Sequence, residues 1–259
     1  MKNPEKNKTF FFIRGFTQSA FLTVISRISG FVRDIFIAGS LGAGIFSDIF
    51  LIAFKLPNLF RRITAEGALT SAFLPIYSKL KIKNGEVIAF VYFKNVLYRV
   101  VIYLFILMLI LQITMPFVIQ FLAPGFIDND NVIKQITSLS RITIIFMPLI
   151  SIVAVLGVAT NVSGKFWILA FTPTILNSSI IIGCFFVGDY WSIKSLPLAI
   201  AVVFGGLIQI IFILIMIKKF NIFDFKNLEK NSNGRNFNDK IQFQLSQTWK
   251  KFLPAAFGG

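Results

Sequence analysis

Charged side chains stand inside two strongly apolar stretches of this chain, and their chemistry needs an explanation. The first stretch contains SRISGFVRD, with Arg27, Arg33 and Asp34. The second begins near Asp48. Its other charged residues are Lys55, Arg61, Arg62 and Glu66. Basic residues outnumber acids in this set, and guanidinium groups donate paired hydrogen bonds to phosphate, so the surplus favours an anionic, phosphate-bearing ligand.

Helical spacing predicts which of these side chains share a face. Arg27, Gly30 and Asp34 are three and then four residues apart, which predicts one common face of a helix. Ser26 and Arg33 are predicted to form the stripe beside it. The two stretches would then turn polar faces toward a shared interior.

The second stretch shows the same kind of stripe. It is predicted to hold Lys55, Asn58, Arg62 and Glu66, with Arg61 to its side. Pro57 is expected to kink this helix, and interrupted helices beside a polar cavity recur in membrane transporters.

The cost of charge in lipid decides how these residues are used. An Arg, Lys or Asp at the bilayer centre costs roughly 2.5–3.5 kcal/mol on insertion scales. Such groups are tolerated where they face water, a cavity or each other. The alternative to a ligand cavity is a set of interhelical salt bridges or snorkelling side chains, which applies most to Arg61, Arg62 and Glu66.

Long apolar runs set the class of the protein. Of its 259 residues 56% are hydrophobic and 14% charged, and the mean hydropathy is +0.77. Spans long enough to cross a bilayer are predicted at about 17–40, 46–77, 95–122, 137–160, 166–188 and 195–217. The sequence therefore predicts an all-α polytopic membrane protein, with an interruption of the second span at KLPN (55–58).

Basic residues outside the spans gather in alternate connections. They lie before the first span and after the second, fourth and sixth, whereas the other connections are short and neutral or acidic. Because Lys and Arg are enriched on the cytoplasmic side of membrane proteins, the pattern predicts a cytoplasmic N-terminus. It also accounts for the net charge of +15 without nucleic acid as a partner.

Four segments follow from this layout. They are a basic cytoplasmic N-terminus at 1–16, a six-helix transmembrane lobe at 17–218, a basic cytoplasmic loop at 219–250 and the start of a seventh helix at 251–259. Within the loop, KIQFQLSQTWKKFL has the composition of an interfacial helix with Trp249 toward lipid. A solvated basic loop is the alternative.

Composition excludes several kinds of chemistry. The chain has no histidine and one cysteine, Cys184, so it holds no Ser-His-Asp triad, no HExxH site and no cysteine-based zinc site. We expect no cofactor, no metal and no enzymatic activity. An intramembrane enzyme with Asp34 and Asp48 as a carboxylate dyad is a rival interpretation, but neither lies in a protease-like motif and Arg33 adjoins one of them.

Several motifs together resemble a known family. SRISGFVRD, LGAG followed by SD, and above all AFKLPNLFRRITAEGALTSAFLPIY are similar to the N-terminal signature of the MurJ (MviN) lipid-linked peptidoglycan precursor flippases. LAPGF, FTPTILN and a GG pair before Gln209 follow in order. That family belongs to the MOP superfamily, which also holds the multidrug and toxin (MATE) extruders and the polysaccharide flippases.

The resemblance implies one lobe of a two-lobe transporter. Family members have two six-helix lobes around a cationic cavity that takes a pyrophosphate head group and passes it across the membrane by alternating access. By position, the resemblance implies Arg27, Arg33 and Arg61 as cavity arginines and Asp48 as the acidic position of the second helix. Supporting positions are Ser26, Asp34, Lys55, Arg62 and Glu66.

The expected function is transport of an undecaprenyl-linked peptidoglycan precursor (lipid II) from the inner to the outer leaflet of the bacterial inner membrane. The matched region ends with the first residues of a seventh helix, so a separately encoded C-terminal lobe is a candidate partner. Two alternatives stay open. One is a non-transporting remnant or lipid-binding scaffold, and the other is an exporter of another anionic lipid-linked saccharide.

Overall fold

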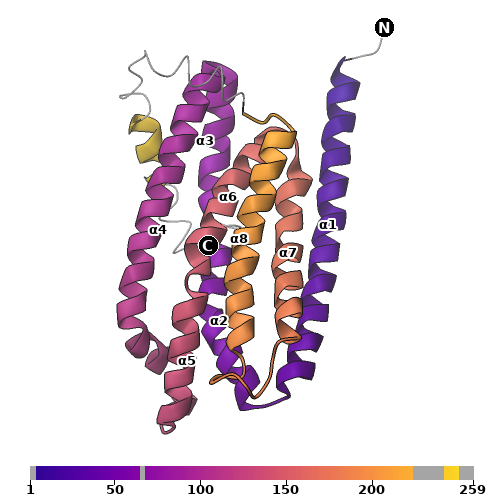
Figure 1. Ribbon diagram of the computed structural model, residues 1–259. Helices are drawn as coiled ribbons and strands as arrows, with labels where there is room; N and C mark the ends of the chain where they lie inside the picture. The colour runs from indigo at the N-terminus through magenta and orange to yellow at the C-terminus, as the bar shows by residue number, and fades with distance from the viewer. Residues whose placement is uncertain (1–3, 65–67, 224–241, 251–259) are drawn as a thin grey trace.

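The protein is a bundle of long helices. The computed structural model describes residues 4–64, 68–223 and 242–250, and no strand occurs in these ranges. The elements in chain order are α1 (Pro4–Leu41), α2 (Ile45–Thr64), α3 (Ala68–Asn84), α4 (Glu86–Leu122), η1 (Pro124–Phe126), α5 (Asp130–Thr143), α6 (Phe146–Val162), α7 (Phe166–Cys184) and α8 (Leu196–Lys219) (Figure 1). The predicted all-α class is confirmed.

Two of the predicted spans each consist of two helices. The span at 46–77 contains α2 and most of α3, and the span at 137–160 contains the end of α5 and nearly all of α6. Between α5 and α6 the backbone makes a turn at Ile144 and Ile145, where the amide of Ile145 donates to the carbonyl of Ile142 at 3.2 Å. This three-residue spacing replaces the regular four-residue spacing of an α-helix and ends α5.

The long helices run alternately up and down. In Figure 1 the N-terminal end of α1 lies at the top, together with the α3–α4 and α6–α7 connections. The α1–α2, α4–α5 and α7–α8 connections lie at the bottom. The basic last turns of α3 and α8 therefore lie at the same end of the bundle as the start of α1, as the alternating charge pattern predicts. Which end faces the cytoplasm stays a prediction.

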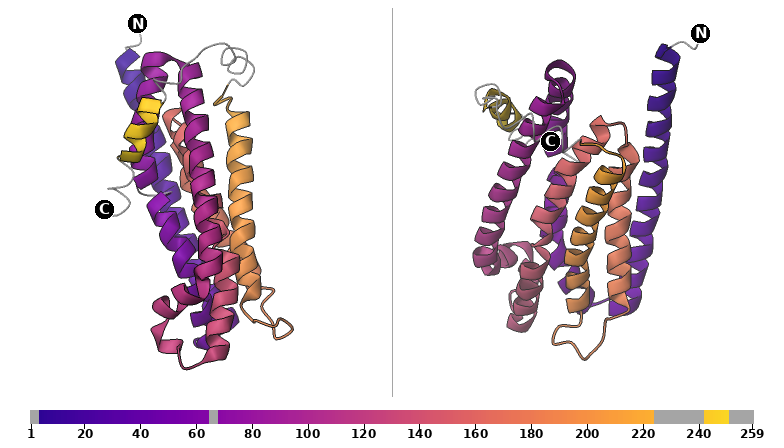
Figure 2. Two further views of the ribbon diagram at one scale, coloured as in Figure 1. Left: turned by 90° about the vertical axis from the view of Figure 1, so that its left-hand side faces the viewer. Right: turned by 45° about the horizontal axis from the view of Figure 1, so that its top comes forward.

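The outermost helix, α1, is held by one neighbour. It packs along α7 and makes little contact with α2, while α6 lies in the centre of the bundle against α4, α7 and α8 (Figures 1 and 2). Thirteen of the seventeen residues of α6 are buried, which fits a central helix that is apolar on all sides. The gap in packing between α1 and α2 matters for the site described below.

Apolar surface covers the outside of the bundle. On α1, the exposed residues Phe21, Ile28, Phe31 and Ile35 recur at helical spacing. Within the described residues, four stretches are long and apolar enough to cross a membrane: Glu86–Leu122, Asp130–Val162, Phe166–Cys184 and Leu196–Lys219. The helices α1 and α2, which carry the charged residues, are not among them.

Helix α2 runs through Pro57 without the predicted interruption at KLPN. Proline has no N–H, so it leaves the carbonyl four residues earlier, that of Ala53, without its helical partner. The hydroxyl of Thr143 on α5 donates to this carbonyl at 2.6 Å. In α7 the hydroxyl of Thr172 likewise donates, at 2.9 Å, to the Leu169 carbonyl that Pro173 leaves. The continuity of α2 therefore depends on a residue distant in sequence.

The segment 242–250 is helical and docks on α4. Leu245 is buried, Thr248 shares a hydrogen bond with the hydroxyl of Tyr92, and Trp249 meets the ring of Tyr103 edge-on. The half-buried Trp249 ring thus packs on one face against protein, and its contact with lipid stays a prediction. The neighbouring residues 224–241 and the predicted seventh helix at 251–259 lie outside the described residues.

The packing of α7 against α8 can be tested at Gly183, where the two helices approach closely. A Cβ atom added at Gly183 would lie 2.7 Å from the Cβ of Ala201, which can move only with its backbone. We expect Gly183→Ala to lower the free energy of unfolding by about 1–3 kcal/mol through overpacking. Thermal unfolding in detergent measures the change.

The matched control is Gly39→Ala. A Cβ at this helical position has no neighbour within 4 Å, so the substitution should be neutral or stabilise by up to ~1 kcal/mol through helix propensity. Equal unfolding temperatures for Gly183→Ala and the unsubstituted protein would contradict the observed helix approach.

Candidate functional site

A cationic cavity lies where α1 stands apart from α2. Its volume is about 550 Å³, and it is bounded by α1, α2 and α7 together with the C-terminal end of α6. Three arginines line it: Arg27 and Arg33 from α1 and Arg61 from α2. No acidic residue is among its lining residues in the described part of the chain. The remaining polar lining residues are Ser19, Thr23, Ser26, Asn58, Asn161 and Asn177.

A second hollow adjoins the first along the same groove. Its volume is about 450 Å³, and Asp34 and Lys55 line it. Arg33, Phe54 and Asn58 line both hollows and so stand at the boundary between them. The groove between α1 and α2 thus carries cationic groups along its length, with a single carboxylate, that of Asp34, among its described lining residues.

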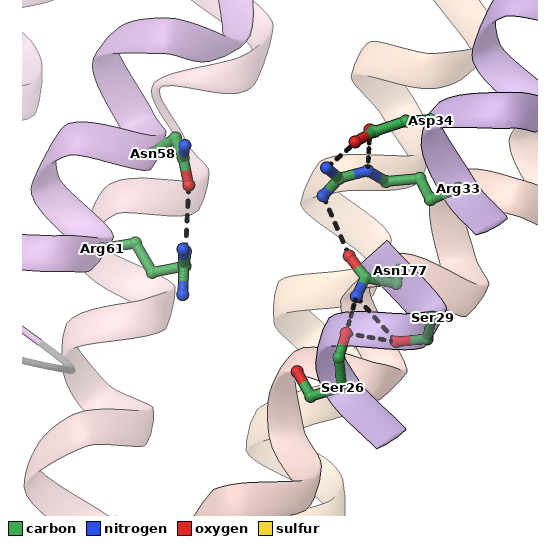
Figure 3. Close-up of polar contacts among 7 residues, drawn as sticks. All are labelled: Ser26, Ser29, Arg33, Asp34, Asn58, Arg61 and Asn177. Carbon is green, nitrogen blue, oxygen red and sulfur yellow. Dashed lines mark hydrogen bonds and ion pairs between the residues drawn. The ribbon is translucent and has the colours of Figure 1, made fainter. Parts of the chain in front are cut away.

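Arg33 is held from two sides (Figure 3). Its Nε and Nη2 donate to Oδ1 of Asp34 at 3.0 and 2.7 Å, and its Nη1 donates to Oδ1 of Asn177 at 2.9 Å. The Asp34 carboxylate is 60% exposed, so water screens much of this ion pair. These contacts fix the plane of the guanidinium where it meets the cavity.

Asn177 joins α7 to α1. It is 5% exposed, and its Nδ2 donates to the hydroxyl of Ser29 at 2.8 Å and to the carbonyl of Ser26 at 3.2 Å. Its Oδ1 accepts from Arg33 as described above, so one amide uses both its oxygen and its nitrogen across the interface (Figure 3). Sequence reasoning missed this residue, although a lone Asn in the apolar FTPTILN segment is itself a signal.

Arg61 stands on the α2 side of the cavity. Its Nε donates to Oδ1 of Asn58, one turn earlier in the helix, at 3.0 Å. Figure 3 places this pair across the open groove from the cluster around Arg33. The two helices therefore present guanidinium groups to one space from separate walls, a geometry suited to an anion with several oxygen atoms.

The predicted site residues divide into four groups. Ser26, Arg27, Arg33 and Arg61 line the main cavity, and Asp34 and Lys55 line the adjoining hollow. Asp48 is exposed in the first turn of α2, and Arg62 is exposed further along, and neither lines a hollow. Glu66 lies outside the described residues.

The predicted stripes need correction by one position on each helix. On α1, Arg33 and not Asp34 shares the cavity with Arg27 and Gly30. On α2, Arg61 and not Arg62 joins Asn58. Spacings of three and four residues fit a helical face about equally well, so helical spacing alone could not choose between neighbouring positions, whereas the resemblance named Arg33 and Arg61.

The comparison with protein families decides the assignment of the chain. Residues 37–258 match the family model described as "Lipid II flippase MurJ". The chain belongs to the MurJ family. A protein of Rickettsia prowazekii described as "Probable lipid II flippase MurJ" is 38% identical over 200 residues, covering 77% of this chain and 39% of the relative. A relative of the same description from Buchnera aphidicola (subspecies Acyrthosiphon pisum) is 34% identical over 92% of this chain and 44% of its own length.

A solved structure shares the fold. The chain matches "Lipid II flippase MurJ, inward closed conformation" with a TM-score of 0.65 and 22% sequence identity over 91% of its length. The match covers 46% of the solved chain. The chain thus spans less than half the length of these MurJ proteins, and its helices correspond to one part of the MurJ fold.

The Asn177 bridge leads to a test of how α1 is held. Asn177→Ala leaves the Ser29 hydroxyl and the Arg33 guanidinium without a shared partner, and we expect a loss of about 1–3 kcal/mol in unfolding free energy. Thermal unfolding in detergent measures the loss. Ser178→Ala, at the exposed neighbouring position, is the matched control and should be neutral. A neutral Asn177→Ala would contradict the bridge.

Proposed function

We propose that this chain acts as a lobe of a lipid II flippase in the bacterial inner membrane. In this proposal the cationic cavity receives the pyrophosphate of the undecaprenyl-linked precursor, and alternating access carries the head group from the inner to the outer leaflet. The observation that carries the proposal is the convergence of Arg27, Arg33 and Arg61 on one cavity between helices with apolar outer faces. Family membership and the names of the relatives support it.

The ligand class follows from the charges that meet at the cavity. The lining of the main cavity contains three guanidinium groups and no carboxylate among the described residues. Guanidinium groups in a hollow among apolar helices are costly to desolvate, and an anion with several oxygens offsets that cost. Ser, Thr and Asn side chains beside the arginines offer donors and acceptors suited to sugar hydroxyls and amides.

Transport without catalysis fits the acidic residues. Asp34 is engaged by the neighbouring Arg33, and Asp48 lines neither hollow, so no carboxylate dyad is assembled from this pair. In our proposal these two acids serve the cavity indirectly. Asp34 orients Arg33, and Asp48 acts at the start of α2, as its place in the family signature implies.

The orientation in the membrane follows from the positive-inside rule. The end of the bundle that holds the start of α1 also holds the C-terminal ends of α3 and α8, whose last turns carry Lys81, Lys83, Lys218 and Lys219. We propose that this end is cytoplasmic. The loops at the other end, such as 123–129, would then face the periplasm.

A second lobe is part of the proposal. Alternating access needs two bodies that move against each other, and the chain spans 39% to 44% of the length of the two relatives described above. We propose that a second six-helix lobe closes the open side of the groove, either within a longer polypeptide or as a separate chain. A lipid-binding lobe that does not transport is the second candidate, because all three cavity arginines lie on this chain.

Removing a cavity arginine tests the transport proposal. In cells that depend on this protein for lipid II export, we expect Arg33→Ala or Arg61→Ala to reduce the lipid II accessible at the outer leaflet by at least about tenfold, because each removes a charge-assisted contact to phosphate. Accessibility to a lipid II-cleaving enzyme added outside the cells measures the effect, at matched protein levels.

The control is an arginine outside the cavity. Arg99 on α4 donates to Gln242 at 3.1 Å and lines neither hollow, so Arg99→Ala should leave export unchanged. Normal export by both cavity variants would overturn the proposal. If the unsubstituted chain binds lipid II but does not export it, the lipid-binding lobe would be favoured.

A further inference from the structure

The last turn of α5 touches two helices at the places where prolines break their hydrogen bonding. Thr143 bonds to α2 beside Pro57, and Arg141 bonds to α4 beside Pro116. These contacts lie outside the cavity and involve none of its lining residues. They raise the question of what α5 contributes to the placement of α2, which carries one wall of the cavity.

The Thr143 hydroxyl supplies a hydrogen-bond donor that one backbone carbonyl of α2 lacks. Pro57 cannot donate to the carbonyl of Ala53, and both Ala53 and Thr143 are fully buried, so bulk water does not reach this carbonyl. The hydroxyl lies 2.6 Å from this carbonyl and 3.3 Å from the carbonyl of Ser140. The Ser140 carbonyl already accepts from the amide of Ile144 at 2.9 Å, so the one hydroxyl proton is needed at Ala53.

A reciprocal pair joins α5 to α4. Pro116 leaves the carbonyl of Gln112 without its helical donor, and Nε of Arg141 donates to it at 3.2 Å. The turn after α5 diverts the amide of Ile145 from the Arg141 carbonyl to that of Ile142. The Gln112 side chain donates to the Arg141 carbonyl at 2.7 Å. Each of the two side chains therefore donates to the backbone carbonyl of the other residue, and in both cases a helix break has removed the usual N–H donor.

We propose that the last turn of α5 is a latch, and that Thr143 is a positioning residue for the phosphate-binding cavity. The Arg141–Gln112 pair anchors the turn to α4, and the Thr143 hydroxyl fixes the turn of α2 around Pro57. Asn58 follows Pro57 directly, lines both hollows and accepts from Arg61 at 3.0 Å. The latch therefore sets where Asn58 and Arg61 stand, and this role rests on the proposed function.

The hydrogen bond itself is tested by an unfolding cycle that needs no ligand. Thr143→Val keeps the shape of the side chain and removes the donor, so we expect about a tenfold fall in the ratio of folded to unfolded protein. Pro57→Ala restores an N–H that can donate to Ala53, so Thr143→Val should have little effect in that background. Thr143→Ser keeps the hydroxyl and should retain most of the stability.

The positioning role is tested by ligand binding. The full chain in nanodiscs is titrated with undecaprenyl pyrophosphate, at a temperature where every variant is folded. We expect Thr143→Val to weaken binding several-fold and Thr143→Ser to restore it. Because the hydroxyl acts through Arg61 and Asn58, Thr143→Val should weaken binding much less in an Arg61→Ala background than in the unsubstituted chain.

Other experimental outcomes would each contradict a specific part of the proposal. Equal losses from Thr143→Val with and without Pro57→Ala would overturn the latch. Unchanged binding by folded Thr143→Val, or equal weakening in both Arg61 backgrounds, would overturn the positioning role. Absence of binding by the unsubstituted chain would overturn the proposed function and the positioning role together, while the unfolding cycle would still decide whether the hydroxyl holds α2.

Discussion

The need to give guanidinium groups a polar space within an apolar bundle governs this structure. Three arginines inside an apolar bundle require a polar space of their own, and the bundle provides it by holding α1 against α7 and away from α2. The outer face of α1 stays apolar, with Phe21, Ile28 and Phe31 exposed. Helix α1 thus has an apolar outer face and a polar face toward the cavity, and the polar face forms one wall of the groove.

Backbone hydrogen bonding imposes the second constraint. In an apolar environment a carbonyl freed by proline needs a partner from within the protein. The partners here are Thr143 for α2, Arg141 for α4 and Thr172 for α7. Two of the three belong to a single turn of α5, so the helix breaks that shape the bundle are tied to one another. The groove depends on these ties because α2 carries Asn58 and Arg61.

Apolar length predicted the class, and the cost of buried charge predicted a polar interior between the first two spans. The motif resemblance predicted the family and named Arg27, Arg33 and Arg61, and these three residues line the cavity. Helical spacing alone did not choose between Arg61 and Arg62, or between Arg33 and Asp34, since both members of each pair fit a helical face. The roles of Asn177 and Thr143 were not predicted for another reason. Their partners, Arg33 and Ala53, are distant in sequence, and only the packed structure brings them together.

Binding of undecaprenyl pyrophosphate to the full chain in nanodiscs of uncharged lipid measures the cationic cavity most directly. We expect saturable binding that weakens as salt is raised, competes with inorganic pyrophosphate and is lost when Arg27, Arg33 and Arg61 are all replaced by alanine. Replacement of an exposed cation outside the cavity, such as Lys134, should leave it unchanged. Equal affinity for undecaprenol, which has no phosphate, or undiminished binding by the triple variant would contradict the account.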